Sequence, residues 1–230
     1  MAFYGLITLS IGAGLFLVAL GLITWLHRRY CVPYALLTVG MITYLGALLA
    51  QLLAVRVLDQ ALLGILPIGA LVLGIAAGFS EETARALGYQ WLARSAVSRP
   101  QALMIGAGHG LVPVLYTALI ALNVGLSVLA EAEPGQTLAL TDVSRSLAEA
   151  LNSLLPVLMH MALSWLVLQA FLRGQAGWIF GAIFLRAVVE ITAALLGPPT
   201  AWGVVIWRGA VALASLPLIR YLAVGDRTKQ

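Results

Sequence analysis

Residues 61–93 read ALLGILPIGALVLGIAAGFSEETARALGYQWLA, an apolar stretch that holds three charged side chains, Glu81, Glu82 and Arg85. The stretch is longer than the roughly 20 residues that a helix needs to cross a bilayer. A charged group at bilayer depth costs several kcal/mol unless it is paired, hydrated or used in function. We therefore expect a membrane helix here, and its three charges mark a candidate functional site.

The composition of the whole chain agrees with this expectation. Of its 230 residues, 62% are hydrophobic and 10% are charged, and the mean hydropathy is +1.01. Soluble domains keep about a quarter of their residues charged, so we expect an integral membrane protein with lipid as a partner. The net charge of +4 comes from basic residues at the ends of apolar segments, which indicates membrane topology rather than nucleic-acid binding. The single cysteine, Cys31, excludes an internal disulfide framework.

The apolar segments predict an all-α, polytopic membrane protein with one transmembrane domain over residues 1–230. Seven expected spans cover residues 4–26, 33–55, 61–93, 101–129, 147–172, 177–196 and 200–220. The one long connection is the polar stretch from Glu131 to Arg145. Most basic residues gather on one side of the spans: Arg28, Arg29, Arg94, Arg99, Arg173, Arg220, Arg227 and Lys229. This bias places the N-terminus outside and the C-terminus in the cytoplasm, and the short loops suit a prokaryotic plasma membrane.

Ionisable residues on four of the expected spans fall at similar depths. At 1.5 Å per residue from the cytoplasmic ends, they lie roughly 12 to 20 Å into the membrane. They are Glu81, Glu82, His109, His160, Arg186 and Glu190. One polar cavity inside the bundle would explain the common depth. The simpler alternative is that Glu81 with Arg85, and Arg186 with Glu190, pair along one helix face, while each histidine bonds a neighbouring helix.

Two further features lie within the expected spans. Gly106, Gly108 and Gly110 flank His109, which predicts close helix packing around that histidine. Arg208 lies in the middle of the last span, and either Asp59 or Glu190 is its expected partner.

The polar residues permit a specific chemistry. A glutamate beside a histidine can take a proton from water. A second histidine, His160, and the hydroxyl of Ser164 one turn later could steady the oxyanion of a tetrahedral intermediate, while Arg85 compensates the glutamate charge. The competing use is a zinc site with Glu81, His109 and His160 as ligands and one open position. No HExxH motif is present, so we favour metal-free water activation and expect no cofactor.

Three segments carry a family likeness: Glu81-Glu82-Thr-Ala-Arg85, Gly106-Ala-Gly-His109-Gly and His160-Met-Ala-Leu-Ser164. In this order they resemble the motifs of YhfC-type membrane peptidases, a group similar to the CAAX prenyl proteases, the bacterial CPBP proteins and PrsW. The resemblance implies an intramembrane peptidase of the glutamic type that acts on a peptide or membrane protein. It implies that Glu81 and His109 activate water, that His160 and Ser164 bind the oxyanion, and that Glu82 and Arg85 support them.

The chain departs from the family pattern at two places. Leu111-Val112-Pro113 follows the GHG segment where the family pattern has an acidic residue, and Arg186-Ala-Val-Val-Glu190 replaces a histidine-based pair on the sixth span. Glu190 is kept as a candidate site residue. The altered pair favours a second interpretation, a non-catalytic scaffold such as the seven-span subunit of gamma-secretase. A transporter is a third, and the lack of an inverted repeat counts against it.

Overall fold

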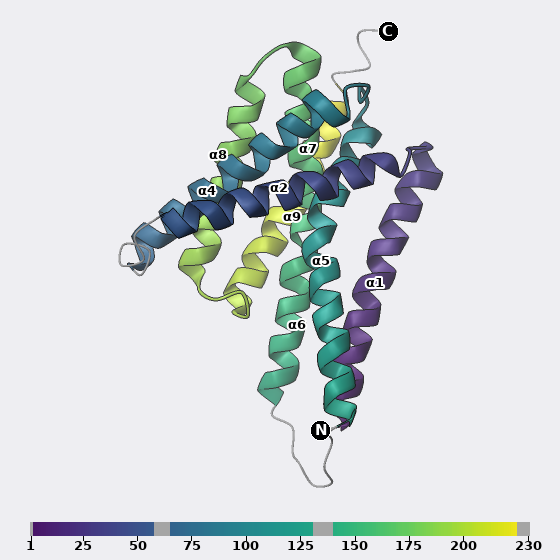
Figure 1. The fold of residues 1–230 in the computed structure, drawn as a ribbon, viewed down its shortest axis with the longest axis vertical. Helices are drawn as coiled ribbons and strands as arrows, with labels where there is room; N and C mark the ends of the chain where they lie inside the picture. Colours follow the sequence, from purple (N-terminus) through teal and green to yellow (C-terminus); the bar gives the residue numbers. More distant parts are fainter. Residues whose placement is uncertain (1, 58–64, 131–139, 225–230) are drawn as a thin grey trace.

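The computed structural model describes residues 2–57, 65–130 and 140–224, and the described chain is helical without strands (Figure 1). Its elements are α1 (Ala2–Tyr30), α2 (Ala35–Val57), α4 (Leu66–Leu87), η1 (Gly88–Leu92), α5 (Arg99–Ala130), α6 (Leu140–Leu154), α7 (Pro156–Arg173), α8 (Gly177–Leu196) and α9 (Trp202–Val224). Of these, η1 is a single π-helical turn that continues α4. The all-α prediction is confirmed.

Six helical stretches of the described chain are long and apolar enough to cross a membrane, as expected of an integral membrane protein. They are Phe3–Tyr30, Ala35–Arg56, Arg99–Ala130, Asp142–Arg173, Gly177–Leu196 and Trp202–Arg220. The third expected span corresponds to α4 and η1, except for residues 61–64, which lie outside the described residues. Three ionisable side chains on α4 lower its hydropathy, and it is not among the six. The seventh span and the orientation therefore stay predictions.

Helix α6 begins earlier than the sequence suggested. The expected loop from Glu131 to Arg145 lies outside the described residues up to residue 139, but residues 140–145 belong to α6. The sequence there is polar yet suited to a helix, because Asp142 lies in the first turn and Arg145 pairs with Glu149 one turn later, with Nε and Oε1 3.2 Å apart. The polar residues 140–145 therefore form an exposed helix end and not part of a loop.

Helix α5 lies at the centre of the bundle, where it packs against α1, α2 and α7, and α4 packs against α8 and α2. In Figure 1, α1, α5 and α6 run along the long axis of the molecule, and α2 and α4 cross them at a steep angle. The second half of α4 thereby comes near the first half of α5, the start of α7 and the middle of α8. The ionisable residues of the four helices come together in this region.

Glycines allow α5 to approach its neighbours closely. A Cβ atom added to Gly106 would lie 2.5 Å from the carbonyl oxygen of His160 on α7, and one added to Gly108 would lie 2.1 Å from that of Leu37 on α2. These neighbours are backbone atoms, so a side chain at either position would push a helix away. The predicted close packing around His109 is confirmed.

Candidate functional site

Glu81, His109 and His160 meet at one buried point although they lie on α4, α5 and α7. Nε2 of His109 lies 3.6 Å from Oε2 of Glu81, and Nδ1 of His160 lies 3.8 Å from the same oxygen. The centroids of the two imidazole rings are 4.9 Å apart. All three side chains are buried. A carboxylate and two imidazoles therefore form a compact triangle inside the helix bundle.

The orientation of His109 is set by Thr43 on α2. Thr43 Oγ1 donates to the carbonyl oxygen of Gly40 at 2.7 Å, so the same hydroxyl accepts from Nδ1 of His109 at 3.0 Å. A neutral imidazole carries one ring proton, so Nε2 of His109 presents a lone pair toward Glu81. This nitrogen is buried and has no hydrogen-bond partner among the described residues. Two acceptor atoms, Oε2 of Glu81 and Nε2 of His109, thus face each other.

Arg85 connects Glu82 with His160. Its Nη1 donates to Glu82 Oε2, and its Nη2 lies 3.2 Å from Nδ1 of His160. A guanidinium cannot accept a hydrogen bond, so this imidazole nitrogen is the acceptor and the ring proton of His160 lies on Nε2. Glu82 and Arg85 are fully buried, where an unpaired charge would be strongly destabilising. The simpler interpretation, a Glu81–Arg85 pair, is wrong because Arg85 pairs with Glu82.

Glu81 pairs instead with Arg186 on α8. Nε of Arg186 lies 2.6 Å from Oε2 of Glu81 and Nη2 lies 2.8 Å from Oε1, which is a bidentate ion pair. The close approach of α4 and α8 makes this pair possible. A Cβ atom on Gly78, one turn before Glu81, would lie 2.6 Å from the carbonyl oxygen of Ile183, one turn before Arg186.

The ion pairs continue from Arg186 toward α9. Nη1 of Arg186 donates to Glu190, as the sequence suggested, and Nη2 of Arg208 lies 3.3 Å from Oε2 of Glu190. Glu190 is therefore a partner of Arg208, while Asp59 lies outside the described residues. The Glu82–Arg85 pair adjoins this chain of ion pairs through His160, whose Nδ1 lies near both Arg85 and Glu81. Together they hold Glu81, Glu82 and Glu190 with Arg85, Arg186 and Arg208. Three carboxylates balance three guanidinium groups.

The hydroxyl of Ser164 is directed toward η1. Its Oγ lies 2.7 Å from the hydroxyl of Tyr89, which also donates to the carbonyl oxygen of Ser164 at 3.0 Å. In the described part of the chain, no hydrogen bond joins Ser164 to Glu81 or to either histidine. Ser164 lies one turn after His160, as expected, and its present contact fixes η1 to α7.

Sequence reasoning missed three polar contacts of the site, from Thr43, Gln51 and Tyr89. Gln51 Nε2 on α2 donates to Ser80 Oγ at 2.9 Å and lies 3.4 Å from Oε1 of Glu81. Each of the three lies in an apolar segment, and that isolation is the signal that could have identified it. The sequence criterion started from Asp, Glu, His and Arg residues in apolar segments, and it added a hydroxyl only where one lay a helical turn from such a residue, as Ser164 does.

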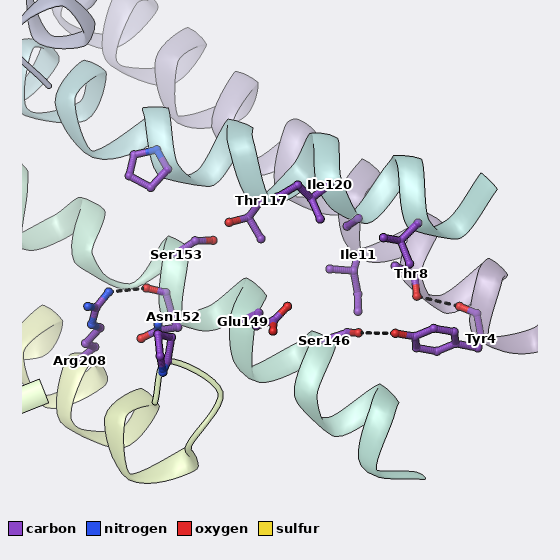
Figure 2. Close-up of a pocket in the computed structure, with 14 residues that line it drawn as sticks. Tyr4, Thr8, Ile11, Thr117, Ile120, Ser146, Glu149, Asn152, Ser153 and Arg208 are labelled. Atoms are coloured by element: carbon purple, nitrogen blue, oxygen red, sulfur yellow. Dashed lines mark hydrogen bonds between the residues drawn. The ribbon is translucent and has the colours of Figure 1, made fainter. Parts of the chain in front are cut away.

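A pocket of about 470 Å³ lies at the far end of the ion-pair group, between α1, α5, α6 and α9 (Figure 2). Arg208 lines this pocket, and its Nη1 donates to the carbonyl oxygen of Asn152 at 3.0 Å. At the other end of the pocket, the hydroxyls of Tyr4 and Ser146 lie 3.1 Å apart. Because Arg208 also contacts Glu190, the ion pairs connect this polar pocket with Glu81.

Glu81, His109 and His160 have the donor types of a catalytic zinc site, with one donor atom from each within 4.8 Å of the others. Nε2 of His109 is free to bind a metal. However, Arg186 holds both oxygens of Glu81, and the charges of the group are already balanced. A dication would add two uncompensated charges in a buried place. The residues in this arrangement do not fit a metal.

Apolar helices that can span a membrane, with a buried carboxylate–imidazole cluster between them, define a polytopic membrane protein with an ionisable site in its interior. The chain belongs to the YhfC intramembrane metalloprotease family, whose model matches residues 14–158. The match includes Glu81 and His109 and ends just before His160. No curated protein and no solved structure matches the chain significantly.

Proposed function

We propose that this chain is an intramembrane peptidase of the glutamic type. The observation that supports it best is the pair of facing acceptors, Oε2 of Glu81 and Nε2 of His109, 3.6 Å apart beside His160. Two acceptors cannot bond each other, so they need a donor between them, and a water molecule supplies two protons. In this proposal the water that they hold is the nucleophile.

The proposed reaction begins when Glu81 takes a proton from this water. The water oxygen attacks the carbonyl carbon of the substrate peptide bond, and the carbonyl oxygen becomes an oxyanion. His160 donates to the oxyanion from Nε2, and Ser164 joins it once its hydroxyl turns away from Tyr89. Glu81 then passes its proton to the leaving nitrogen, and the C–N bond breaks.

The surrounding charges hold this arrangement. Arg85, anchored by Glu82, fixes the proton of His160 on the nitrogen that serves the oxyanion. Each oxygen of an ionised carboxylate accepts up to about two hydrogen bonds, so Glu81 keeps a lone pair for water while Arg186 is bound. Glu190 supports Arg186 from the side away from Glu81.

The proposal includes a membrane arrangement. The chain forms one transmembrane domain of seven spans, with α4 among them, the N-terminus outside and the C-terminus in the cytoplasm. Its membrane is a prokaryotic plasma membrane, its surroundings are lipid, and its substrate is a peptide or membrane protein. Nucleic acid is not a partner.

A second candidate is a catalytically degenerate scaffold or binding protein of the same superfamily. The bidentate Arg186–Glu81 pair favours it, because Arg186 binds both carboxylate oxygens and so covers the α8 side of the Glu81–His109–His160 cluster. In such a protein the ion pairs would serve to join α4, α8 and α9.

Cleavage of a pooled library of membrane peptides in liposomes tests the proposal. We expect the wild type to cut at least one peptide and both Glu81→Ala and His109→Ala to cut none. Asp142→Asn is the matched control, since it removes an exposed carboxylate on α6. If folded wild-type protein leaves every peptide intact, the scaffold becomes the better account.

A further inference from the structure

We infer that the guanidinium group of Arg186 is the resident cation of the Glu81–His109–His160 site and that it keeps zinc out. Arg186 binds both oxygens of Glu81, at 2.6 and 2.8 Å. A metal ion bound to the same carboxylate would therefore lie within about 5 Å of the guanidinium, since zinc lies about 2.0 to 2.2 Å from its oxygen ligands. The two cations would compete for one carboxylate.

Burial makes this competition severe. The Arg186 side chain is 9% exposed and that of Glu81 is 5% exposed, so little water screens the repulsion between cations. Glu190 holds Arg186 in place from the other side, and Arg208 holds Glu190. The guanidinium is thus held between two carboxylates.

The His109 side of the site is compatible with a metal, whereas Nδ1 of His160 is in contact with Arg85. Nε2 of His109 presents an unpartnered lone pair, and Thr43 fixes its ring as a supporting residue of a metal ligand would. Removal of the Arg186 charge would release both oxygens of Glu81 from their ion pair, with the long Gln51 contact to Oε1 remaining, and leave the group with one excess negative charge. The side chain of Arg186 thus decides whether Glu81 binds a guanidinium or is available to a metal.

The test measures zinc rather than activity. Purified wild type, Arg186→Met, Arg186→Gln and Arg186→Lys are incubated with Zn²⁺, passed through gel filtration and analysed for metal per chain. Arg186→Lys is the matched control because it keeps the positive charge. Circular dichroism and the elution volume show which variants are folded, and the Met and Gln variants serve as alternatives if one fails to fold.

We expect wild type and Arg186→Lys to hold no stoichiometric zinc. Arg186→Met or Arg186→Gln should gain about one ion per chain and lose it when His109→Ala is added. The inference is overturned if wild type holds one zinc ion that His109→Ala removes. Folded Met and Gln variants that bind no zinc would overturn it equally.

This inference rests on the proposed function for the identity of the site, but the two can fail separately. A protein that cuts no peptide yet shows the expected zinc pattern would keep Arg186 as the resident cation and lose the peptidase. A zinc-loaded wild type that cuts peptides would keep the peptidase and lose the metal-free site.

Discussion

At the scale of single residues, the position of Glu81 is explained by its partners. A carboxylate buried this deeply is tolerated only when opposite charge and hydrogen bonds compensate it. Arg186 supplies two strong hydrogen bonds and Gln51 a long contact, while two imidazoles face the same oxygen. The ion pair with Arg186 compensates the buried charge of Glu81, and the side facing the histidines is where we propose that water is activated.

Glu81→Gln tests the proposed base with little change in shape. The amide keeps an oxygen for Arg186 but cannot take a proton from water, so we expect the cleavage rate to fall by about 10²- to 10⁴-fold. Initial rates in liposomes measure the change, with Asp142→Asn expected to match wild type. A Glu81→Gln variant that cuts at the wild-type rate would exclude Glu81 as the base.

Thr43→Val tests the support of His109. Valine has a similar shape but offers no acceptor for Nδ1, which would then be a buried unsatisfied donor. We expect the free energy of unfolding to fall by about 1–3 kcal/mol. Thr43→Ser keeps the hydroxyl and is the control. Denaturation in detergent compares the variants, and equal stability of the valine and serine variants would show that this hydrogen bond contributes little.

The main members of the site could be predicted because ionisable residues stand out in apolar helices. Counting residues along the helices predicts similar depths for Glu81, His109, His160 and Arg186. Their pairing could not be predicted in the same way. Glu82 and Glu81 lie three and four residues before Arg85, so either could pair with it along the helix. Because Arg186 on α8 binds Glu81, Arg85 pairs with Glu82.

At the scale of secondary-structure elements, the site depends on how closely α4 and α8, and α5 and α7, approach. Gly78 and Gly106 lie at these two crossings, each facing backbone atoms of the neighbouring helix. The glycines around His109 predicted close packing, but the sequence could not tell which neighbour each of them faces. The helix ends were less predictable, as α6 shows, because polar residues form exposed helix ends as well as loops.

Gly106→Ala tests the α5–α7 crossing. The added methyl group would lie 2.5 Å from backbone atoms of His160 and Met161, so α7 must shift. We expect a loss of about 1–3 kcal/mol in stability, with lower activity because His160 moves with its helix. Gly181→Ala on α8 is the control, since nothing lies within 4 Å of its added methyl group. Thermal unfolding in detergent compares them, and equal loss in both variants would contradict the account.

At the scale of the whole molecule, six stretches can cross the membrane by length and hydropathy, and the charged helix α4 decides whether a seventh does. An odd number of spans places the two termini on opposite sides. The proposed orientation rests on the arginine bias, which belongs to the loops rather than to the packed bundle.

Cysteine labelling tests this topology. Cys31 is exposed between α1 and α2, on the side that we expect to face the cytoplasm. A membrane-impermeant maleimide should therefore label Cys31 only after cells are permeabilised. In a Cys31→Ser background, Phe3→Cys should react in intact cells and Lys229→Cys should not. Labelling at both Phe3→Cys and Lys229→Cys in intact cells would indicate an even number of spans.

The central claim is that the buried Glu81–His109–His160 triangle hydrolyses peptide bonds without a metal. The most direct test is the rate at which chelator-treated, zinc-free wild type cuts a membrane peptide in liposomes, compared with Glu81→Gln. We predict that the wild type keeps its full rate after the treatment and that Glu81→Gln loses it. A rate that disappears with the chelator and returns with Zn²⁺ would contradict the claim.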